Sequence, residues 1–350
     1  MDASTQQTTP KSTLTPPKKV TIRDVASLAG VSYGTVSRYL NGNEHVSSAA
    51  ATSIAKAIQH SRYVPNNAAR SLAQRKTQVV ALIIQVEADA TIAQASVSAV
   101  MSSANQTLGD AGFQMVTLIA NTDQSTSRIA RLVQSDFADG YILFSMSNDD
   151  SLTTVFLHAN RPVVLSEYDE DSELPFPAVD FANEQGQQAI TQYLLDRGHK
   201  RLAYICGPGY SPSAINRLRG FQEAVGTAFD PSLLFYADDW EISSGELAVV
   251  EFQPYLDSLD GVVCANDSIA IGVINQLGRM GYRVPGDIAV TGFDDSPYAM
   301  MSECKLTTVR QDSSRHGKTL AELLLRQLAG EAIGKQLIQL PTELVIRQSA

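Results

Sequence analysis

Polar side chains that can hydrogen-bond a small molecule follow two short apolar runs in the second half of the chain. Asn266 and Asp267 come after residues 262–264, and Asp294 comes shortly after residues 288–290. An asparagine side chain donates and accepts hydrogen bonds, and a carboxylate accepts them from hydroxyl groups. Because ligands of parallel sheets bind at the carboxyl ends of the strands, we expect Asn266 and Asp294 to line a cleft. We expect Asp267 to cap the following helix.

Motifs for catalysis, cofactors and metals are weak. The sequence GVSYG at residues 30–34 fits the G-x-S-x-G pattern of a nucleophilic serine, but that motif needs a strand before the serine, and a helical pattern precedes it here. The sequence GPG at 207–209 lacks the third glycine of a dinucleotide loop, and its proline has no N–H for a phosphate. The histidines and cysteines show no metal-ligand spacing. We expect no enzymatic activity, no cofactor and no metal.

The charge of the chain is divided unevenly. Residues 1–76 contain ten Lys and Arg against three acidic residues, a net charge of +7, whereas the rest of the chain has 17 against 34, a net charge of −17. Phosphate binding is therefore expected only in the N-terminal segment. There is neither a secretory signal nor a long apolar stretch, and the three cysteines are widely separated, so we expect a cytoplasmic protein. Residues 1–17 have the composition of a disordered tail.

Residues 21–60 contain three short helical patterns, at 22–29, 33–40 and 48–60. Thr21 with Asp24, Ser32 and Ser47 provide the start signals, and Gly30 with Val31 forms a tight turn between the first two. Apolar residues can close a miniature core between the helices: Ile22, Val25, Ala26, Ala29, Val31, Val36, Leu40, Ile54 and Ile58. Two helices joined by a short glycine-containing turn predict a helix-turn-helix.

Beyond residue 77, short apolar runs alternate with amphipathic helical stretches. The expected strands are 79–84, 113–119, 141–144, 163–165, 202–206, 262–264 and 288–290, and the clearest helices are 183–196, 214–225 and 269–280. This alternation predicts parallel, doubly wound α/β sheets. The segment is too long for one such sheet, so we expect two lobes with a ligand cleft between them.

Several long motifs in order resemble the LacI/GalR (lactose-repressor) family of transcription regulators: VTIRDVASLAGVSYGTVSRYLNG, HVSSAA, YVPNNAARSLA, GHKRLAYICGP, SPSAINRLRGF, VCANDSIAIG, RVPGDIAVTGFDD, LTTVRQD and ELVIRQS. The resemblance covers residues 18–349. It implies a helix-turn-helix head, a hinge helix and a two-lobed body like that of periplasmic sugar-binding proteins. The implied bounds are 18–64 for the head, 65–76 for the hinge, 77–181 with 312–340 for the N-terminal lobe, and 182–311 with 341–350 for the C-terminal lobe.

The resemblance also implies which residues touch DNA. Tyr33, Gly34 and Arg38 occupy the base-reading positions, and the Arg38 guanidinium can bind guanine bidentately. Gly34 departs from the side-chain-bearing residue usual there, so it reads nothing directly. The remaining expected contacts are Thr21, Ser32, Thr35, Ser37 and Asn41 in the head, and Asn66, Ala69, Arg70 and Leu72 in the hinge.

The resemblance implies that the hinge helix, residues 65–73, folds only on DNA, and nine residues cannot hold a helix alone in water. By resemblance, Ala69 lets the hinges of two chains approach closely, and Leu72 enters the minor groove as an apolar wedge. A plain linker between domains is the alternative.

For the body, the resemblance implies a small effector bound between the lobes. Arg217 matches the arginine that holds ligand hydroxyls, Trp240 offers a flat face for a sugar ring, and Asn148, Asn266 and Asp294 complete the expected set. Two departures affect the ligand class: residues 85–100 lack the family's pocket aromatic, and Ala182 replaces an acidic residue. A sugar is the expected effector, with a nucleoside as the alternative.

Together these features predict a homodimeric repressor of carbohydrate-utilisation genes that binds a pseudo-palindromic DNA operator at the nucleoid and has no membrane partner. A catabolite regulator that depends on a carrier protein is a second interpretation. A stand-alone sugar-binding protein is a third, but it requires a secretion signal and no basic head.

Overall fold

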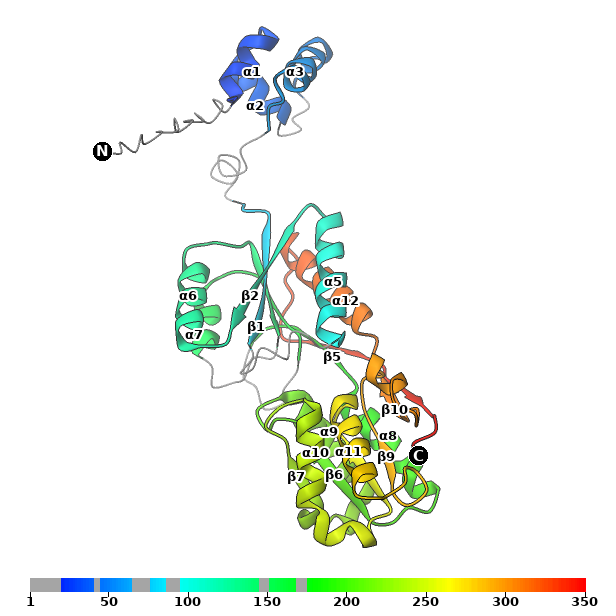
Figure 1. Cartoon of the computed structure of the whole chain (residues 1–350). Coiled ribbons are helices and arrows are strands. Elements are labelled where there is room, and N and C mark those ends of the chain that lie inside the picture. Colours follow the sequence, from blue (N-terminus) through cyan, green and yellow to red (C-terminus); the bar gives the residue numbers. More distant parts are fainter. Residues whose placement is uncertain (1–19, 41–44, 65–75, 86–94, 145–150, 168–174) are drawn as a thin grey trace, which may run out of the picture. The chain divides into compact units, whose positions relative to one another are not determined.

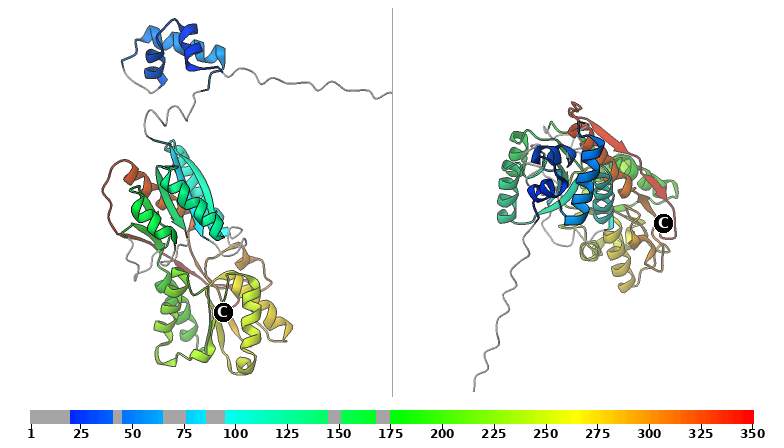
Figure 2. Two further views of the ribbon diagram at one scale, coloured as in Figure 1. Left: turned by 90° about the vertical axis from the view of Figure 1, so that its left-hand side faces the viewer. Right: turned by 90° about the horizontal axis from the view of Figure 1, so that it is seen from above.

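The computed structural model describes residues 20–40, 45–64, 76–85, 95–144, 151–167 and 175–350. The chain divides into two compact units, Met1–Lys76 and Thr77–Ala350. We call them the head and the body (Figures 1 and 2). Within the described ranges, no helix has the length and hydropathy that crossing a membrane requires. The same ranges contain no cluster of three or more His, Cys, Asp or Glu side chains that could hold a metal ion.

The head consists of helices α1 (Ile22–Ala29), α2 (Tyr33–Leu40) and α3 (Ser48–Ser61). Thr21 and Asp24 form the predicted capping box at α1, with the Thr21 hydroxyl donating to the Asp24 carboxylate at 2.8 Å. Gly30 has φ 67°, a left-handed conformation that turns the chain between α1 and α2. The predicted core is confirmed: one residue from each helix is fully buried at its centre, namely Val25, Val36 and Ile54.

The first sheet of the body has six parallel strands in the order β11-β5-β4-β3-β1-β2. The strands are β1 (Val79–Gln85), β2 (Gln114–Ala120), β3 (Gly140–Phe144), β4 (Val163–Leu165), β5 (Ala178–Phe181) and β11 (Leu337–Leu340). Helices α5 (Ala95–Asp110) and α12 (Ser313–Leu328) cover one face, and α6 (Asp123–Gln134) and α7 (Ser151–His158) cover the other (Figure 1). Because side chains alternate along a strand, Leu82 packs under α5 and Ile83 under α6.

The second sheet has four parallel strands in the order β7-β6-β8-β9. The strands are β6 (Leu202–Cys206), β7 (Leu234–Tyr236), β8 (Gly261–Cys264) and β9 (Ala289–Thr291). Helices α8 (Asn183–Asp196) and α9 (Pro212–Val225) cover one face, and α10 (Ile242–Glu251) and α11 (Asp267–Arg279) cover the other. Both sheets are therefore doubly wound, as the alternation of apolar runs and helices predicts.

The chain passes between the two sheets three times, after β5, after β10 (Thr308–Arg310) and between β11 and β12 (Glu343–Val345). Strands β10 and β12 pair antiparallel in a small ribbon of their own. Short 3-10 helices occur at Gly226–Ala228, Pro231–Leu233, Gln253–Ser258 and Pro297–Met300. The sequence analysis did not predict β5, β7, β10, β11 or β12. Strands of three or four residues show no period of their own, and only some of them, such as β4, β8 and β9, were recognised as short apolar runs.

Candidate functional site

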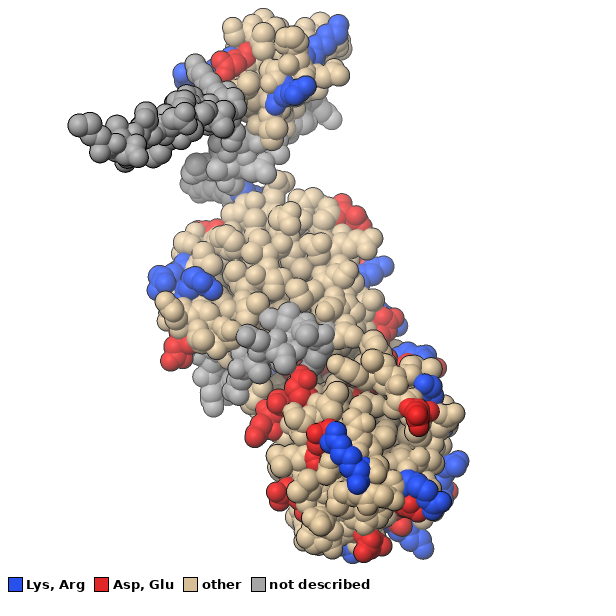
Figure 3. Space-filling model, in the orientation of Figure 1, with Lys and Arg blue, Asp and Glu red and all other residues tan. Residues whose placement is uncertain are grey.

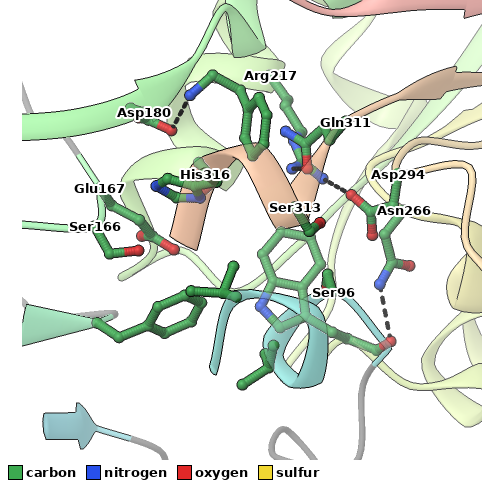
Figure 4. A pocket seen from close by; sticks show the side chains of 16 residues that line it. Ser96, Ser166, Glu167, Asp180, Arg217, Asn266, Asp294, Gln311, Ser313 and His316 are labelled. Carbon is green, nitrogen blue, oxygen red and sulfur yellow. Dashed lines mark hydrogen bonds and ion pairs between the residues drawn. The ribbon is translucent and has the colours of Figure 1, made fainter. Parts of the chain in front are cut away.

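A cavity lies in the body where the carboxyl ends of strands from both sheets meet (Figure 4). The space inside it, including its open mouth, is about 650 Å³. The N-terminal ends of α5, α9 and α12 complete the walls. The described residues that line it are Ser96, Val97, Val100, Phe144, Ser166, Glu167, Asp180, Phe181, Ser213, Arg217, Trp240, Asn266, Asp294, Gln311, Ser313 and His316.

Arg217 holds the centre of the cavity wall on α9. Its side chain is 6% exposed, and its Nε donates to Asn183 Oδ1 at 2.9 Å while Nη1 donates to the Ala265 carbonyl at 2.6 Å. Nη1 also lies 3.4 Å from Asp294 Oδ1. The Gln311 amide joins the group, accepting from Arg217 Nη2 at 3.2 Å and donating to Asp294 Oδ1 at 3.1 Å. These four partners fix the orientation of the guanidinium and leave one of its five N–H donors, on Nη2, for a ligand.

Asp294 follows β9 in a conformation that side chains rarely adopt, with φ 107°. Its backbone N–H donates to the carbonyl of Val309 at 2.7 Å, so strand β10 fixes this conformation. Burial raises the pKa of Asp294 to about 6, although the Arg217 guanidinium lowers it. The carboxyl group can therefore exchange a proton near neutral pH as well as accept hydrogen bonds.

Asp267 lies behind Asp294 and is fully buried. Burial raises the pKa of Asp267, with the nearby Asp294 carboxylate raising it further. Its carboxylate accepts from Thr308 Oγ1 at 2.5 Å and from the Ser296 N–H at 2.6 Å. The prediction that Asp267 caps α11 is wrong, because the cap is Asn266, whose Oδ1 accepts from Ile269 N at 2.8 Å.

Asn266 therefore both caps α11 and lines the cavity. Its Oδ1 is engaged by the helix, and its Nδ2 donates to the Trp240 carbonyl at 3.1 Å. One amide hydrogen remains for a ligand. Trp240 stacks directly on Gly207, where a Cβ would lie 2.3 Å from the indole ring, and the Arg217 guanidinium is 5.6 Å from the ring centre. The tryptophan is therefore held in place by its neighbours before any ligand arrives.

The first sheet and its helices supply a wall that the sequence did not predict. Ser166 and Glu167 follow β4, Asp180 lies on β5, and His316 lies in the first turns of α12. The Phe181 and His316 rings pack edge to face at 4.9 Å. Asp180 lies on a strand that was not predicted, and His316 is far in sequence from the other lining residues. The only sequence signal for this wall was the predicted strand at 163–165, which Ser166 directly follows. Asn148, a predicted site residue, lies outside the described residues.

In the head, α2 has one buried and one outward face. Val36 is fully buried, whereas Gly34 and Arg38 lie on the opposite side of the helix, and Tyr33 and Ser37 lie on its flank between the two. The Tyr33 side chain is 55% exposed, and Arg38 Nε donates to the Gly34 carbonyl at 3.2 Å. The structure thus brings the predicted base-reading residues onto one surface.

The hydroxyl groups of three predicted DNA contacts, Thr21, Ser32 and Thr35, make hydrogen bonds within the head. Ser32 Oγ accepts from Thr35 N at 3.2 Å and lies 2.9 Å from Thr35 Oγ1, so it caps α2. Thr21 is engaged by Asp24 in the same manner at α1. Of the predicted DNA contacts, Asn41, Asn66, Ala69, Arg70 and Leu72 lie outside the described residues, as do the hinge and the N-terminal tail.

Charge differs between head and body. The described part of the head carries five basic residues, Arg23, Arg38, Lys56, Arg62 and Lys76, against the single acidic Asp24. On the body, acidic and basic side chains are mixed over the visible face (Figure 3). The head is therefore the part of the described chain suited to a polyanion.

Two family models match the two units. "Bacterial regulatory proteins, lacI family" matches residues 21–66, and "Periplasmic binding protein-like domain" matches residues 191–350. The HTH-type transcriptional regulator CelR of Thermobifida fusca is 33% identical over 342 residues, which cover 95% of this chain and 98% of CelR. The chain belongs to the lacI family of bacterial regulatory proteins. It is a DNA-binding regulator of transcription.

Other lacI family members are similar over nearly their whole length. The lactose operon repressor of Escherichia coli K12 is 28% identical, with 95% of this chain and 91% of the repressor covered. Among solved structures, the CelR–cellobiose complex has a TM-score of 0.75 at 31% identity, covering 95% of this chain and 100% of the chain in that structure. The lac repressor dimer bound to operator and an anti-inducer has a TM-score of 0.84 at 26% identity, covering 95% and 99%. These relatives are regulators of transcription rather than enzymes.

Proposed function

We propose that this lacI family member is a homodimeric repressor whose affinity for a pseudo-palindromic operator is controlled by a sugar bound in the body. The cavity that contains Arg217, Asp294 and Trp240 carries this proposal. It combines a fixed guanidinium, a carboxylate and a flat aromatic face, which are the groups that hold the hydroxyls and the C–H face of a sugar ring. Relatives named for sugars support it: CelR was solved with cellobiose, and a ribose operon repressor of Halalkalibacterium halodurans is 30% identical, with 94% of this chain and 96% of the repressor covered.

Control by the ligand follows from where the cavity lies. Both sheets contribute to its walls, so a ligand that contacts both favours one arrangement of the sheets over others. The three connections between the sheets must accommodate any change. Because β10 holds Asp294 through its backbone, contact with this carboxylate is coupled to one of those connections.

In the head, we propose that the outward face of α2 enters the major groove. Arg38 is assigned to a guanine, and Tyr33 and Ser37 lie beside it, while Gly34 allows close approach without reading a base. The hinge residues Ala69 and Leu72 are assigned to the paired hinge and the minor groove on sequence grounds. We place the protein at the nucleoid, where its operator is.

The proposal is tested with the full-length chain and DNA selected from a random library. Fluorescence anisotropy measures the affinity for the selected duplex and for random DNA, with and without a panel of sugars and nucleosides. We expect selection of a pseudo-palindrome, and a change in affinity with at least one sugar. Selection of no defined sequence, or a response only to nucleosides, would contradict the proposal.

Two head variants separate reading from general attraction. Arg38→Ala is expected to cost about 1–3 kcal/mol on the selected duplex and little on random DNA. Lys56→Ala, on α3, is the control and should leave the preference for the selected duplex unchanged. Leu72→Ala should also reduce selected binding more than random binding. If a variant loses equal affinity for the selected duplex and for random DNA, the residue that it replaces does not have the role assigned to it.

A further inference from the structure

The cavity wall carries a charge balance that restricts its ligand. Among the described lining residues, Arg217 is the sole Lys or Arg, and Asp294 at 3.4 Å already balances its charge. His316 does not add a cation, because burial lowers its pKa to about 4 despite the opposing effect of the 2.9 Å hydrogen bond between its Nε2 and the Val179 carbonyl. The remaining ionisable groups on the described wall are the carboxylates of Glu167 and Asp180.

The sequence extends this statement to the rest of the body. Residues 86–94, 145–150 and 168–174 lie outside the described ranges, and they contain eight Asp and Glu but no Lys, Arg or His. Whatever their positions, these segments bring no cation to the cavity. A phosphate group in the cavity would therefore meet carboxylates without an uncommitted basic partner from the described wall or from these three segments.

The wall formed by the first sheet is also rich in hydrogen-bond acceptors. Asp180 is 4% exposed, and its Oδ1 accepts hydrogen bonds from Phe181 N at 2.7 Å and from Asn183 Nδ2 at 2.9 Å. Ser166 is fully buried, and its Oγ has no hydrogen-bond partner among the described residues. A buried hydroxyl without a partner in a cavity wall points to a ligand group that completes it.

We infer, on the basis of the proposed function, that the effector is an uncharged, unphosphorylated sugar, and that Ser166 and Asp180 recognise one of its free hydroxyl groups. A sugar hydroxyl donates to the carboxylate and both donates to and accepts from the serine. A phosphate ester at that position loses the hydroxyl donor and places a dianion beside carboxylates in a partly desolvated site, where like charges repel strongly. The cavity selects against the phosphorylated form of its own effector.

Isothermal titration calorimetry of the full-length chain with matched pairs tests the inference. The pairs are cellobiose with cellobiose 6-phosphate, ribose with ribose 5-phosphate, and glucose with glucose 6-phosphate, and glucosamine is added as a cationic probe. We expect one neutral sugar to bind and its phosphate ester to bind at least about 100-fold more weakly. An ester that binds as tightly as its sugar, or glucosamine binding more tightly than any neutral sugar, would overturn the inference while leaving the proposed sugar response standing. If no member of the panel binds while selected DNA still does, the proposed sugar response fails and the inference falls with it.

Two variants and a control test whether Ser166 and Asp180 produce the preference for the neutral sugar over its phosphate ester. Asp180→Asn keeps the shape and one oxygen but removes the charge, and should reduce the preference for the neutral sugar about tenfold or more. Ser166→Ala should weaken binding of the neutral sugar about fivefold to tenfold, because a hydrogen bond is lost. Asp136→Asn, an exposed carboxylate on the same lobe with a side chain that is 69% exposed, is the control and should change neither value. Circular dichroism confirms that each variant folds. If Asp180→Asn and Ser166→Ala both fold and both leave the preference and the affinity unchanged, the wall has no part in recognition.

Discussion

Arg217→Met removes the guanidinium from the centre of the cavity and keeps an unbranched side chain of similar length. The arginine side chain is 6% exposed and that of Asp294 is 18% exposed, so the pair is largely screened from water. The substitution leaves the Asp294 carboxylate without its cation. It also removes the N–H groups that donate hydrogen bonds to the side chains of Asn183 and Gln311 and to the Ala265 carbonyl. We expect a clear loss of stability of the body.

The magnitude is limited by the proton that Asp294 can take up. Removal of one member of a buried ion pair costs about 3–5 kcal/mol when the other stays charged. Asp294 has a pKa of about 6 even beside Arg217, and without that cation the pKa rises further. At pH 7 the carboxyl group then becomes protonated instead of remaining charged and buried. We therefore expect a loss of about 3 kcal/mol at pH 7, and a smaller loss at pH 5, where Asp294 of the unchanged protein is already largely protonated.

Urea unfolding of the full chain, followed by circular dichroism and by Trp240 fluorescence, measures this loss at both pH values. The double variant Arg217→Met with Asp294→Asn supplies the internal control, because it removes both charges. The double variant should be more stable at pH 7 than Arg217→Met alone. A loss below about 1 kcal/mol for the single variant, or a double variant that is less stable than the single one, would refute the buried ion pair as a stabilising interaction.

Three further predictions concern groups around the same cavity. The pKa of Asp267 is raised from 3.8 to about 8 in the folded body, so between these values the folded state holds a proton that the unfolded chain releases. The free energy of unfolding should therefore fall by roughly 1 kcal/mol per pH unit from pH 6.5 to 8. This window lies above the ordinary pKa of histidine; Asp267→Asn should flatten the slope in urea titrations, and a wild-type stability that rises over this range would contradict the reasoning. Gly207→Ala places a Cβ 2.3 Å from the Trp240 ring, so the fluorescence of this sole tryptophan should shift and sugar affinity should fall. Gly209→Ala, with nothing within 4 Å of its Cβ, is the matched control, and equal spectra for both variants would disprove the displacement. Gly220→Ala puts a Cβ 2.1 Å from a backbone carbonyl of α8, so it should lower stability by about 1–3 kcal/mol in the same urea assay, whereas the Gly209 control should not; a neutral result would mean that α8 and α9 can move apart freely.

The head shows how far local sequence signals reach. Its capping residues, its left-handed glycine and its core residues all lie within about 40 positions, and each acts on neighbours a few residues away. Such signals depend on backbone geometry that the sequence specifies directly. The helix bounds predicted for α1 and α2 therefore agree with the structure residue for residue.

The body was predictable in its architecture and less so in its short elements. The long alternation of apolar runs and helices predicted parallel sheets, and the strands of five or more residues were found near their predicted positions. Strands β7, β10 and β12 have three residues each, and they are strands because they pair with β6 (for β7) and with each other (for β10 and β12). The assignment of Asp267 as a cap failed for a related reason, since Asn266 and Asp267 are equally good capping residues and only the packing against Thr308 decides between them.

The order of the amino acids was enough to predict the helix-turn-helix, the doubly wound body, the basic head on an acidic chain, and the placing of Arg217 and Asp294 in a cleft. These properties depend on residue type, on local spacing and on motifs of consecutive residues, all of which can be recognised without knowing the fold. Which side chains line the cleft together, in contrast, depends on how distant segments of the chain pack. The tertiary structure joined Ser166 and Asp180 to a wall opposite Arg217 and neutralised that arginine with Asp294. It also buried His316 so that it carries no charge. The charge and hydrogen-bonding balance of a cavity is a sum over side chains from distant parts of the chain, and that sum exists only once the strands and helices that carry them have packed together.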